Sequence, residues 1–332
     1  MMRSSPHAMT PTPHRSEFPA LIALFAGALA IGSSGIFVRL SETGPTATAF
    51  WRGCLALPFL AVWALIERRS AVRAAATAAA GAPAPGTLRD PMFFWAGVFF
   101  AGDLALWHTS LLLTSIAAST LEANCAPILV TLLSWTLFGE RPRLGFLAAI
   151  VLAFGGMLLI LAPKLGGGGH ALLGDALGLG TAFFYAGYIL AVARLRSAHG
   201  TGIVMFATTL VFTVLLLPLA LLQPFLPLTA RGWWLLLGCA LSAQVLGQSL
   251  IAYALAHLPA TFSAVGLYAQ VIAAAGYAWL LLGERLAPVQ LAGGAVVLAA
   301  IALARRAPSG GRDPQTQRAS TQSSTPGQSE SR

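Results

Sequence analysis

Four ionisable side chains lie inside apolar stretches of this sequence: Arg52, Asp103, His108 and Glu122. A charged side chain in the interior of a membrane costs roughly 2.5–3.5 kcal/mol or more, so it usually faces a water-filled cavity or a partner. Groups of this kind carry protons or bind charged solutes. The four residues are therefore candidates for binding or transferring a solute.

The depth of each group in its apolar segment separates their roles. At about 1.5 Å per residue, Arg52, His108 and Glu122 all lie roughly 9–10 Å below the same membrane boundary. Because opposite charges attract strongly in a low dielectric, we expect Arg52 and Glu122 to face each other, with His108 close by. Snorkelling of Arg52 to the interface and structural roles for the other two stay open. Asp103 lies near the midplane, where it carries a proton, pairs with a substrate amine or hydrogen-bonds to a neighbouring helix.

Neutral polar and aromatic side chains accompany these charges. The expected substrate-binding or coupling set adds Trp107, Asn124, Tyr185, Gln244, Gln248, Tyr268 and Gln270 to the four ionisable residues. Amides in membrane helices either bind a solute or tie helices together, and the aromatic rings either stack on a substrate or fill space. No catalytic residue is expected among them.

The cysteines give no sign of a metal or redox site. Cys54, Cys125 and Cys239 all lie in apolar segments, without the spacing of a disulfide framework or a zinc site. They are best interpreted as small buried residues. Neither a metal ion nor a cofactor is therefore expected.

The elements that must position these residues are long apolar segments. Ten of them are about long enough to cross a bilayer as helices, and backbone groups in lipid must be satisfied within the segment. They cover residues 20–40, 45–66, 92–114, 116–138, 144–162, 172–195, 202–223, 233–256, 259–281 and 287–304. The predicted fold class is an all-α integral membrane protein with ten transmembrane helices.

An internal repeat relates the two halves of the chain. A shift of 144 positions places Ser119 on Ser263 and Trp135 on Trp279, and it places the Gly-Glu-Arg sequence at 139–141 on that at 283–285. Each repeat would hold five helices, and an odd number means that the repeats cross the membrane in opposite directions. Two inverted five-helix repeats are typical of secondary transporters, whose substrate site lies between the halves.

Composition and charge place the chain in the membrane. Only 9% of its residues are charged and 57% are hydrophobic, whereas soluble domains carry roughly 25% charged residues. The net charge of +9 comes mostly from arginines. They concentrate on the side of both termini, which predicts that both termini are cytoplasmic. No basic stretch interleaved with aromatics lies outside the helices, so nucleic acid is not an expected partner.

The strongest motifs carry a resemblance to a known family. The stretches AGDLALWHTSLLLTSIAASTLEANCAP, TLFGER and LLLGER, in a ten-helix plan, resemble the EamA-type transporters of the drug/metabolite transporter superfamily over roughly residues 18–306. The resemblance implies a cavity lined mainly by helices 1, 3 and 4 of one half and 6, 8 and 9 of the other. The second repeat departs from the first, because Val271 stands where Pro127 does and Gly266 where Glu122 does. This departure argues against identical roles for the two fourth helices.

The domain plan follows from the segments and the repeat. It consists of a cytoplasmic tail (1–19), a first EamA-like repeat (20–162) containing a cytoplasmic linker loop (67–91), a second repeat (172–304) and a disordered cytoplasmic tail (305–332). The expected location is the inner (plasma) membrane. The expected partners are a small-molecule substrate, the lipid bilayer and protons, and a homodimer stays open.

These features predict a secondary active transporter. It would move an amino acid or a similar polar or amphipathic solute by alternating access, in the export direction, driven by a proton gradient or by exchange. The only lysine, Lys164, follows a proline, so the phosphate-binding loop of a nucleotide-driven pump is absent. The alternative is an integral-membrane enzyme, such as a transferase, but no catalytic motif supports it.

Overall fold

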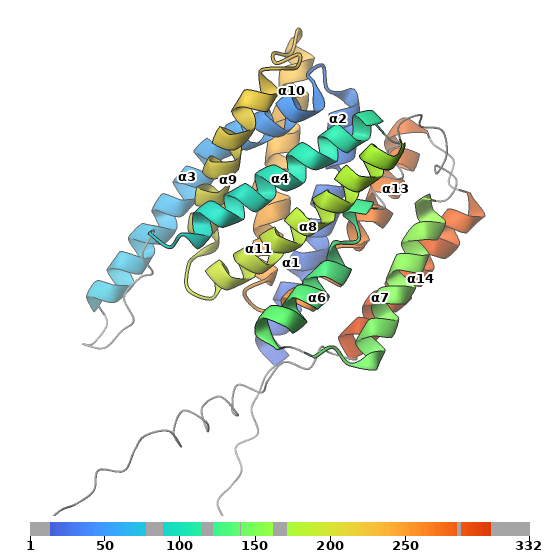
Figure 1. Cartoon of the computed structure of the whole chain (residues 1–332). Helices are drawn as coiled ribbons and strands as arrows, with labels where there is room; N and C mark the ends of the chain where they lie inside the picture. The colour runs from blue at the N-terminus through green and yellow to red at the C-terminus, as the bar shows by residue number, and fades with distance from the viewer. Residues whose placement is uncertain are drawn as a thin grey trace, which may run out of the picture.

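The computed structural model describes residues 14–77, 89–113, 122–139, 141–161, 171–283 and 287–306, and the elements in these ranges are helices (Figure 1). The first half contains α1 (His14–Gly32), α2 (Ser34–Leu40), α3 (Pro45–Thr77), α4 (Met92–Leu113), α6 (Ala126–Phe138) and α7 (Leu144–Leu161). The second half contains α8 (Ala171–Arg196), α9 (Thr201–Ala220), α10 (Ala230–Cys239), η2 (Ala240–Gln248), α11 (Ser249–Ala254), α12 (Ala260–Gly266), α13 (Ala269–Leu282) and α14 (Pro288–Arg306).

Eight segments of the described chain are long and apolar enough to cross a membrane, judged by length and composition. They are Glu17–Leu40, Pro45–Arg73, Leu144–Leu161, Ala176–Arg196, Thr201–Ala220, Ala230–Ala254, Ala260–Leu281 and Pro288–Arg306. Helix α6 is a shorter apolar helix. Large apolar side chains point outward along these segments, as lipid contact requires. A multi-pass, all-helical membrane protein is therefore confirmed, whereas the number of ten spans stays a prediction.

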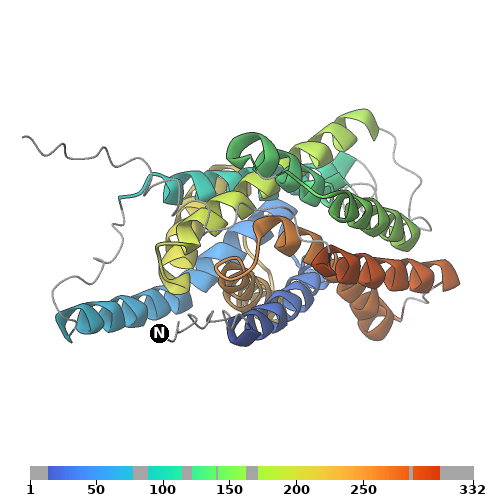
Figure 2. The ribbon, with the colours of Figure 1, turned by 90° about the horizontal axis from the view of Figure 1, so that it is seen from below.

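The helices of the two halves pack in matched pairs. Helix α1, which opens the first half, packs against η2 and α11, and helix α8, which opens the second half, packs against α4. The corresponding helices α3 and α9 pack against each other, as do α7 and α14 (Figures 1 and 2). Each contact made by one half is thus repeated with the roles of the halves exchanged. This pattern fits the two-repeat architecture.

The ends of α3 and α9 are joined by reciprocal hydrogen bonds. The backbone N–H of Ile203, near the start of α9, donates to Oε2 of Glu67 in the last third of α3 at 3.0 Å. The backbone N–H of Thr46, near the start of α3, donates to Oε1 of Gln223 just after α9 at 2.9 Å. Each side chain satisfies an N–H that a helix start leaves unpaired. The two helices therefore run antiparallel, as the equivalent helices of inverted repeats must.

Helices α7 and α14 approach closely through glycine. A Cβ atom added at Gly293 would lie 2.6 Å from the backbone oxygen of Gly156, and one added at Gly156 would lie 2.8 Å from the backbone oxygen of Gly293. Small residues allow such contact between helices in membranes. The side chain of Gln290 donates from Nε2 to the backbone oxygen of Ile160 at 3.0 Å and fixes the register of the pair.

Four expected continuous helices are interrupted, among them the segment at 116–138, which turns at 124–125 before α6. The segment expected at 20–40 breaks at Ser33, whose hydroxyl bonds the backbone oxygen of Ala30 at 2.6 Å and so competes with the helix. The segment at 259–281 turns at 267–268, between α12 and α13. The segment at 233–256 passes through the π-helix η2, a wider turn that often marks a functional site. The period of apolar residues does not reveal these interruptions.

Several expected boundaries also change. Helix α3 continues to Thr77, eleven residues into the linker expected from residue 67, because this stretch is rich in alanine and arginine, which favour helix. Helix α1 begins at His14, and the tail expected from 305 begins no earlier than the end of α14 at Arg306. The remainder of the linker, both outer tails, and Glu140 and Glu284 of the repeated motif lie outside the described residues.

The two glycines of the Gly-Glu-Arg repeat end their helices. Gly139 follows α6 with φ of 72°, and Gly283 follows α13 with φ of 67°. A left-handed residue at this position is a common helix terminus, and glycine adopts it without strain. The repeated motif therefore marks the ends of two equivalent helices.

Candidate functional site

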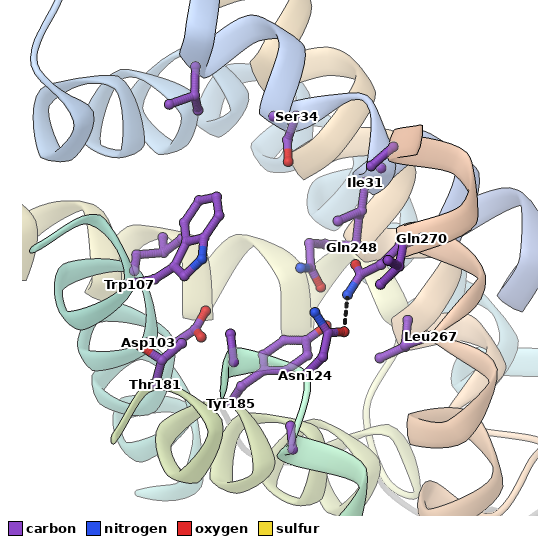
Figure 3. Close-up of a pocket in the computed structure, with 18 of the residues that line it drawn as sticks. Ile31, Ser34, Asp103, Trp107, Asn124, Thr181, Tyr185, Gln248, Leu267 and Gln270 are labelled. Carbon is purple, nitrogen blue, oxygen red and sulfur yellow. Dashed lines mark hydrogen bonds between the residues drawn. The ribbon is translucent and has the colours of Figure 1, made fainter. Parts of the chain in front are cut away.

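A cavity of about 640 Å³ lies between the two halves of the helix bundle (Figure 3). The first half lines it with residues of α1, α2, α3, α4, α6 and α7. The second half contributes residues of α8, η2, α12, α13 and α14. Its size falls within the roughly 300–1,000 Å³ of small-molecule sites. Seven of the eleven residues expected from sequence line it: Arg52, Asp103, Trp107, Asn124, Tyr185, Gln248 and Gln270.

Asp103 projects from α4 into this cavity, beside Trp107 one turn further along (Figure 3). Its side chain is 9% exposed. Its carboxylate makes no hydrogen bond or ion pair with any residue in the described part of the chain. An unpaired buried carboxylate is costly, and its position in a cavity makes a solute or a proton its natural partner.

Arg52 reaches the same cavity from α3 and is held by a relay of polar side chains. Its Nε donates to Oε1 of Gln244 at 3.1 Å, and Nε2 of Gln244 donates to the hydroxyl of Thr209 at 2.9 Å. Phe100 of α4 lies with its ring centroid 5.7 Å from the guanidinium carbon, a cation–π contact. Nη2 is buried without a hydrogen-bond partner among the described residues.

Asn124 occupies the turn that precedes α6, where the chain is not helical. Its backbone oxygen accepts a hydrogen bond from the hydroxyl of Tyr268 at 2.9 Å. Its Oδ1 accepts one from Nε2 of Gln270 at 3.4 Å (Figure 3). The backbone N–H of Ile128 donates to Cys125 instead of Asn124, so Tyr268 satisfies a carbonyl that the break in the helix has released.

This contact joins equivalent points of the two repeats. Tyr268 is the residue that the 144-position shift places on Asn124, and a turn interrupts each helix there. Inverted repeats are related by a pseudo-twofold axis, and equivalent residues can touch each other only where they lie at that axis. Pro127 lacks an N–H and accounts for the break in the first repeat. In the second repeat the matching residue is Val271 and not a proline. There the backbone N–H groups of Gln270 and Val271 donate to the carbonyl oxygens of Leu267 and Tyr268 in tight turns.

Aromatic rings and a glutamine form the wall between α8 and η2. Tyr185 stacks on Tyr188 with ring centroids 6.1 Å apart, and Tyr188 stacks on Phe100 at 4.4 Å. The hydroxyl of Tyr188 donates to Oε1 of Gln248 at 3.5 Å. The stack orients Tyr185 toward the cavity, and the hydrogen bond orients Gln248.

Four expected site residues do not line the cavity. Gln244 and Tyr268 stand behind it, where they position Arg52 and Asn124. His108 is 3% exposed, beside Trp107 with ring centroids 5.1 Å apart. Glu122 packs against α8, since a Cβ atom added at Gly178 would meet its Oε2. The expected pairing of Arg52 with Glu122 is therefore replaced by the bond to Gln244, because equal depth does not place two residues on facing sides of their helices.

Other cavity residues were not expected. Ser34 and Arg39 on α2, Thr181 on α8 and Gln290 on α14 all line it. Thr181 precedes Tyr185 by four residues and so shares its helix face, a signal that the sequence contained. Gln290 lies on a helix with no ionisable residue in its interior, and nothing in the sequence indicated that it reaches the cavity.

Comparisons with known proteins agree with this architecture. The sequence model of the EamA-like transporter family matches residues 18–162 and 172–306. The pseudopaline exporter CntI of Pseudomonas aeruginosa strain UCBPP-PA14 is 30% identical over 217 residues, which cover 65% of this chain and 75% of the relative. The uncharacterized transporter YwfM of Bacillus subtilis strain 168 is 29% identical over 223 residues, covering 66% of this chain and 74% of the relative.

A solved crystal structure shares the fold. It superimposes with a TM-score of 0.70 at 17% sequence identity, and the match covers 88% of this chain and 99% of the other. At this identity the likeness concerns the arrangement of the helices alone.

Proposed function

The chain belongs to the EamA-like transporter family, and from that premise we propose that it is a secondary active transporter that exports a small amino-acid-like metabolite by alternating access. A membrane location and a small-molecule substrate follow from the family. The direction, the class of solute and the driving force are parts of the proposal. Export is favoured because two matching relatives, from two strains of Pseudomonas aeruginosa, are named pseudopaline exporters.

The observation that carries the proposal is the cavity shared by both halves. Asp103 and Trp107 come from the first half, and Tyr185 and Gln248 come from the second. A solute bound there touches both repeats, so a rocking motion of one half against the other exposes the solute to either side. The broken helices at Asn124 and Tyr268 give this motion a place to bend, because their backbone is already released from the regular ladder.

The driving force is a proton gradient or exchange, with Asp103 as the coupling group. It is the carboxylate that both faces the cavity and lacks a hydrogen bond to the described residues. Asp103→Asn keeps the shape and removes the titration. If Asp103 carries the proton, this variant loses gradient-driven accumulation and retains exchange. If it binds an amine, both activities fall together.

We place the protein in the inner membrane with both termini cytoplasmic, on the arginine asymmetry. The two repeats are taken as domains spanning 20–162 and 172–304. Labelling of a single cysteine at position 284 on a cysteine-free background tests this orientation. A label that enters only from the cytoplasm contradicts it.

The function itself is tested by flux. Full-length protein is reconstituted into proteoliposomes loaded with a labelled amino acid, and both the efflux and the chemical identity of the label are followed. The proposal predicts efflux of the unchanged solute, faster with the same solute outside. Chemical conversion of the label would instead favour the membrane-enzyme alternative, and no protein-dependent efflux of any amino acid would contradict the proposal.

A further inference from the structure

We propose that the cavity binds a zwitterion with an apolar body, whose carboxylate pairs with Arg52 and whose ammonium pairs with Asp103. This inference rests on the proposed function and names the recognition elements of the same site. It follows from two opposite charges that line one cavity and yet do not pair with each other.

Arg52 presents an unfilled anion site. Only its Nε makes a hydrogen bond with the described residues, and the relay through Gln244 and Thr209 fixes the plane of the guanidinium. The buried Nη2 therefore has a set direction and no acceptor. A buried polar group of this kind needs an explanation. The planar fork of arginine matches the two oxygens of a carboxylate, so a carboxylate is the group that fits.

Asp103 presents the complementary cation site. Its side chain lies nine-tenths buried on α4, and it has no hydrogen bond or ion pair to the described chain. The cationic side chains in the described lining are the guanidinium groups of Arg52 and Arg39, and neither makes an ion pair with Asp103. Lysine does not occur in the membrane-spanning segments, so the cavity itself offers no ammonium group. An ammonium on the solute would supply the donors that the carboxylate lacks.

The two charges line the same cavity but are not joined. Among the described residues no ion pair forms between Asp103 and Arg52, because Gln244 holds the guanidinium on the side of η2. Two buried opposite charges normally pair directly. A solute that carries both an ammonium and a carboxylate would pair with Asp103 and with Arg52, and so bridge the gap between the two side chains.

The remaining lining fits an apolar body. Trp107 and Tyr185 present aromatic rings to the cavity (Figure 3). Leu104, Leu267 and Val271 present aliphatic surface. Aromatic and aliphatic walls with a few fixed polar groups are typical of small-molecule sites. The expected solute thus resembles an apolar amino acid.

The test removes one charge from the ligand and one from the protein. Three ligands share the same apolar body. Phenylalanine carries both charges, phenylalaninamide carries only the ammonium, and 3-phenylpropionate carries only the carboxylate. Their binding to the full-length protein in detergent is measured by calorimetry. Wild type should bind phenylalanine about 10–100-fold more tightly than either analogue, the range of a lost charge-assisted hydrogen bond.

Each variant should abolish one preference. Arg52→Gln should weaken phenylalanine and 3-phenylpropionate by about the same factor and spare phenylalaninamide. Asp103→Asn should weaken phenylalanine and phenylalaninamide and spare 3-phenylpropionate. Equal affinity of wild type for all three ligands, binding of none, or equal weakening of all three by either variant would overturn the inference.

Matched controls separate charge at the site from charge elsewhere. Arg231→Gln changes an exposed arginine, and Asp90→Asn keeps the cap that Asp90 Oδ1 provides to the N–H of Met92. Both should leave the three affinities unchanged. If Arg52→Gln does not fold, Arg52→Lys replaces it and should retain part of the carboxylate preference.

Flux measurements distinguish this inference from the proposed function. Equal transport of all three ligands would contradict the zwitterion site and leave the transporter intact. The predicted binding pattern without any flux in proteoliposomes would support the site and contradict the transport proposal.

Discussion

Replacing Gly293 by alanine tests how tightly the last helices of the two halves are locked. A Cβ atom there would lie 2.6 Å from the backbone oxygen of Gly156 and 2.9 Å from the backbone nitrogen of Ile160. Ordinary contact begins at 3.4 Å, so the helices must separate by about 0.8 Å, because backbone atoms cannot rotate away. Overpacking of this kind costs about 1–3 kcal/mol.

The neighbouring glycine provides the control. A Cβ atom at Gly294 meets only a side-chain carbon of Ile272 at 4.0 Å. Both substitutions gain the same helix propensity, up to about 1 kcal/mol, so the difference between them isolates the strain. At about 2–4 °C per kcal/mol, Gly293→Ala should melt about 2–12 °C below Gly294→Ala in detergent. Equal melting temperatures would refute the close packing of α7 and α14.

Two further predictions concern the loops and the relay behind the cavity. Hydrogen bonds from the hydroxyl and the backbone N–H of Thr229 hold the pKa of Glu42, which lies between two spans, below its usual value of 4.5. The stabilisation by this carboxylate is therefore complete above that pH and is lost as the pH falls through the lowered pKa, so the melting temperatures of wild type and Glu42→Gln should differ at pH 7 and converge in acid. Gln244→Leu removes the acceptor for Nε of Arg52, and it should cost about 1.5–3 kcal/mol in stability or in affinity for phenylalanine; unchanged values of both would show that the relay does not hold Arg52.

The sequence predicts the cavity better than the contacts within it. Asp103 was expected to face a solute because apolar segments rarely contain a carboxylate, and Trp107 was expected either to stack on a substrate or to fill space. Both residues line the cavity. The sequence gives the depth of a residue along its helix but not the direction in which its side chain points around the helix axis. Equal depth alone therefore suggested Glu122 as the partner of Arg52. The angle depends on packing against Gly178 and on the bond to Gln244, which only the assembled bundle defines.

The breaks in the helices show a second limit of sequence reasoning. The segment 116–138 was predicted as one helix, although Pro127 offers a local reason for its break, and Val271 offers none at the matching position of the second repeat. The turn there coincides with the hydrogen bond from Tyr268 to Asn124, a contact between residues 144 positions apart. Long-range contacts of this kind override local helix propensity. The π-helix η2, which presents Gln244 and Gln248, was hidden for the same reason.

Access to the cavity from both sides of the membrane tests the central claim most directly. Ser34 lines the cavity, and Ser34→Cys on a cysteine-free background changes one atom of its side chain. Ser197→Cys, on the exposed turn between α8 and α9, is the control and should react from one side only. Alternating access predicts that a small impermeant thiol reagent labels position 34 in vesicles of either orientation and that phenylalanine slows both reactions. Labelling from one side only, at a rate that phenylalanine does not change, would contradict the account.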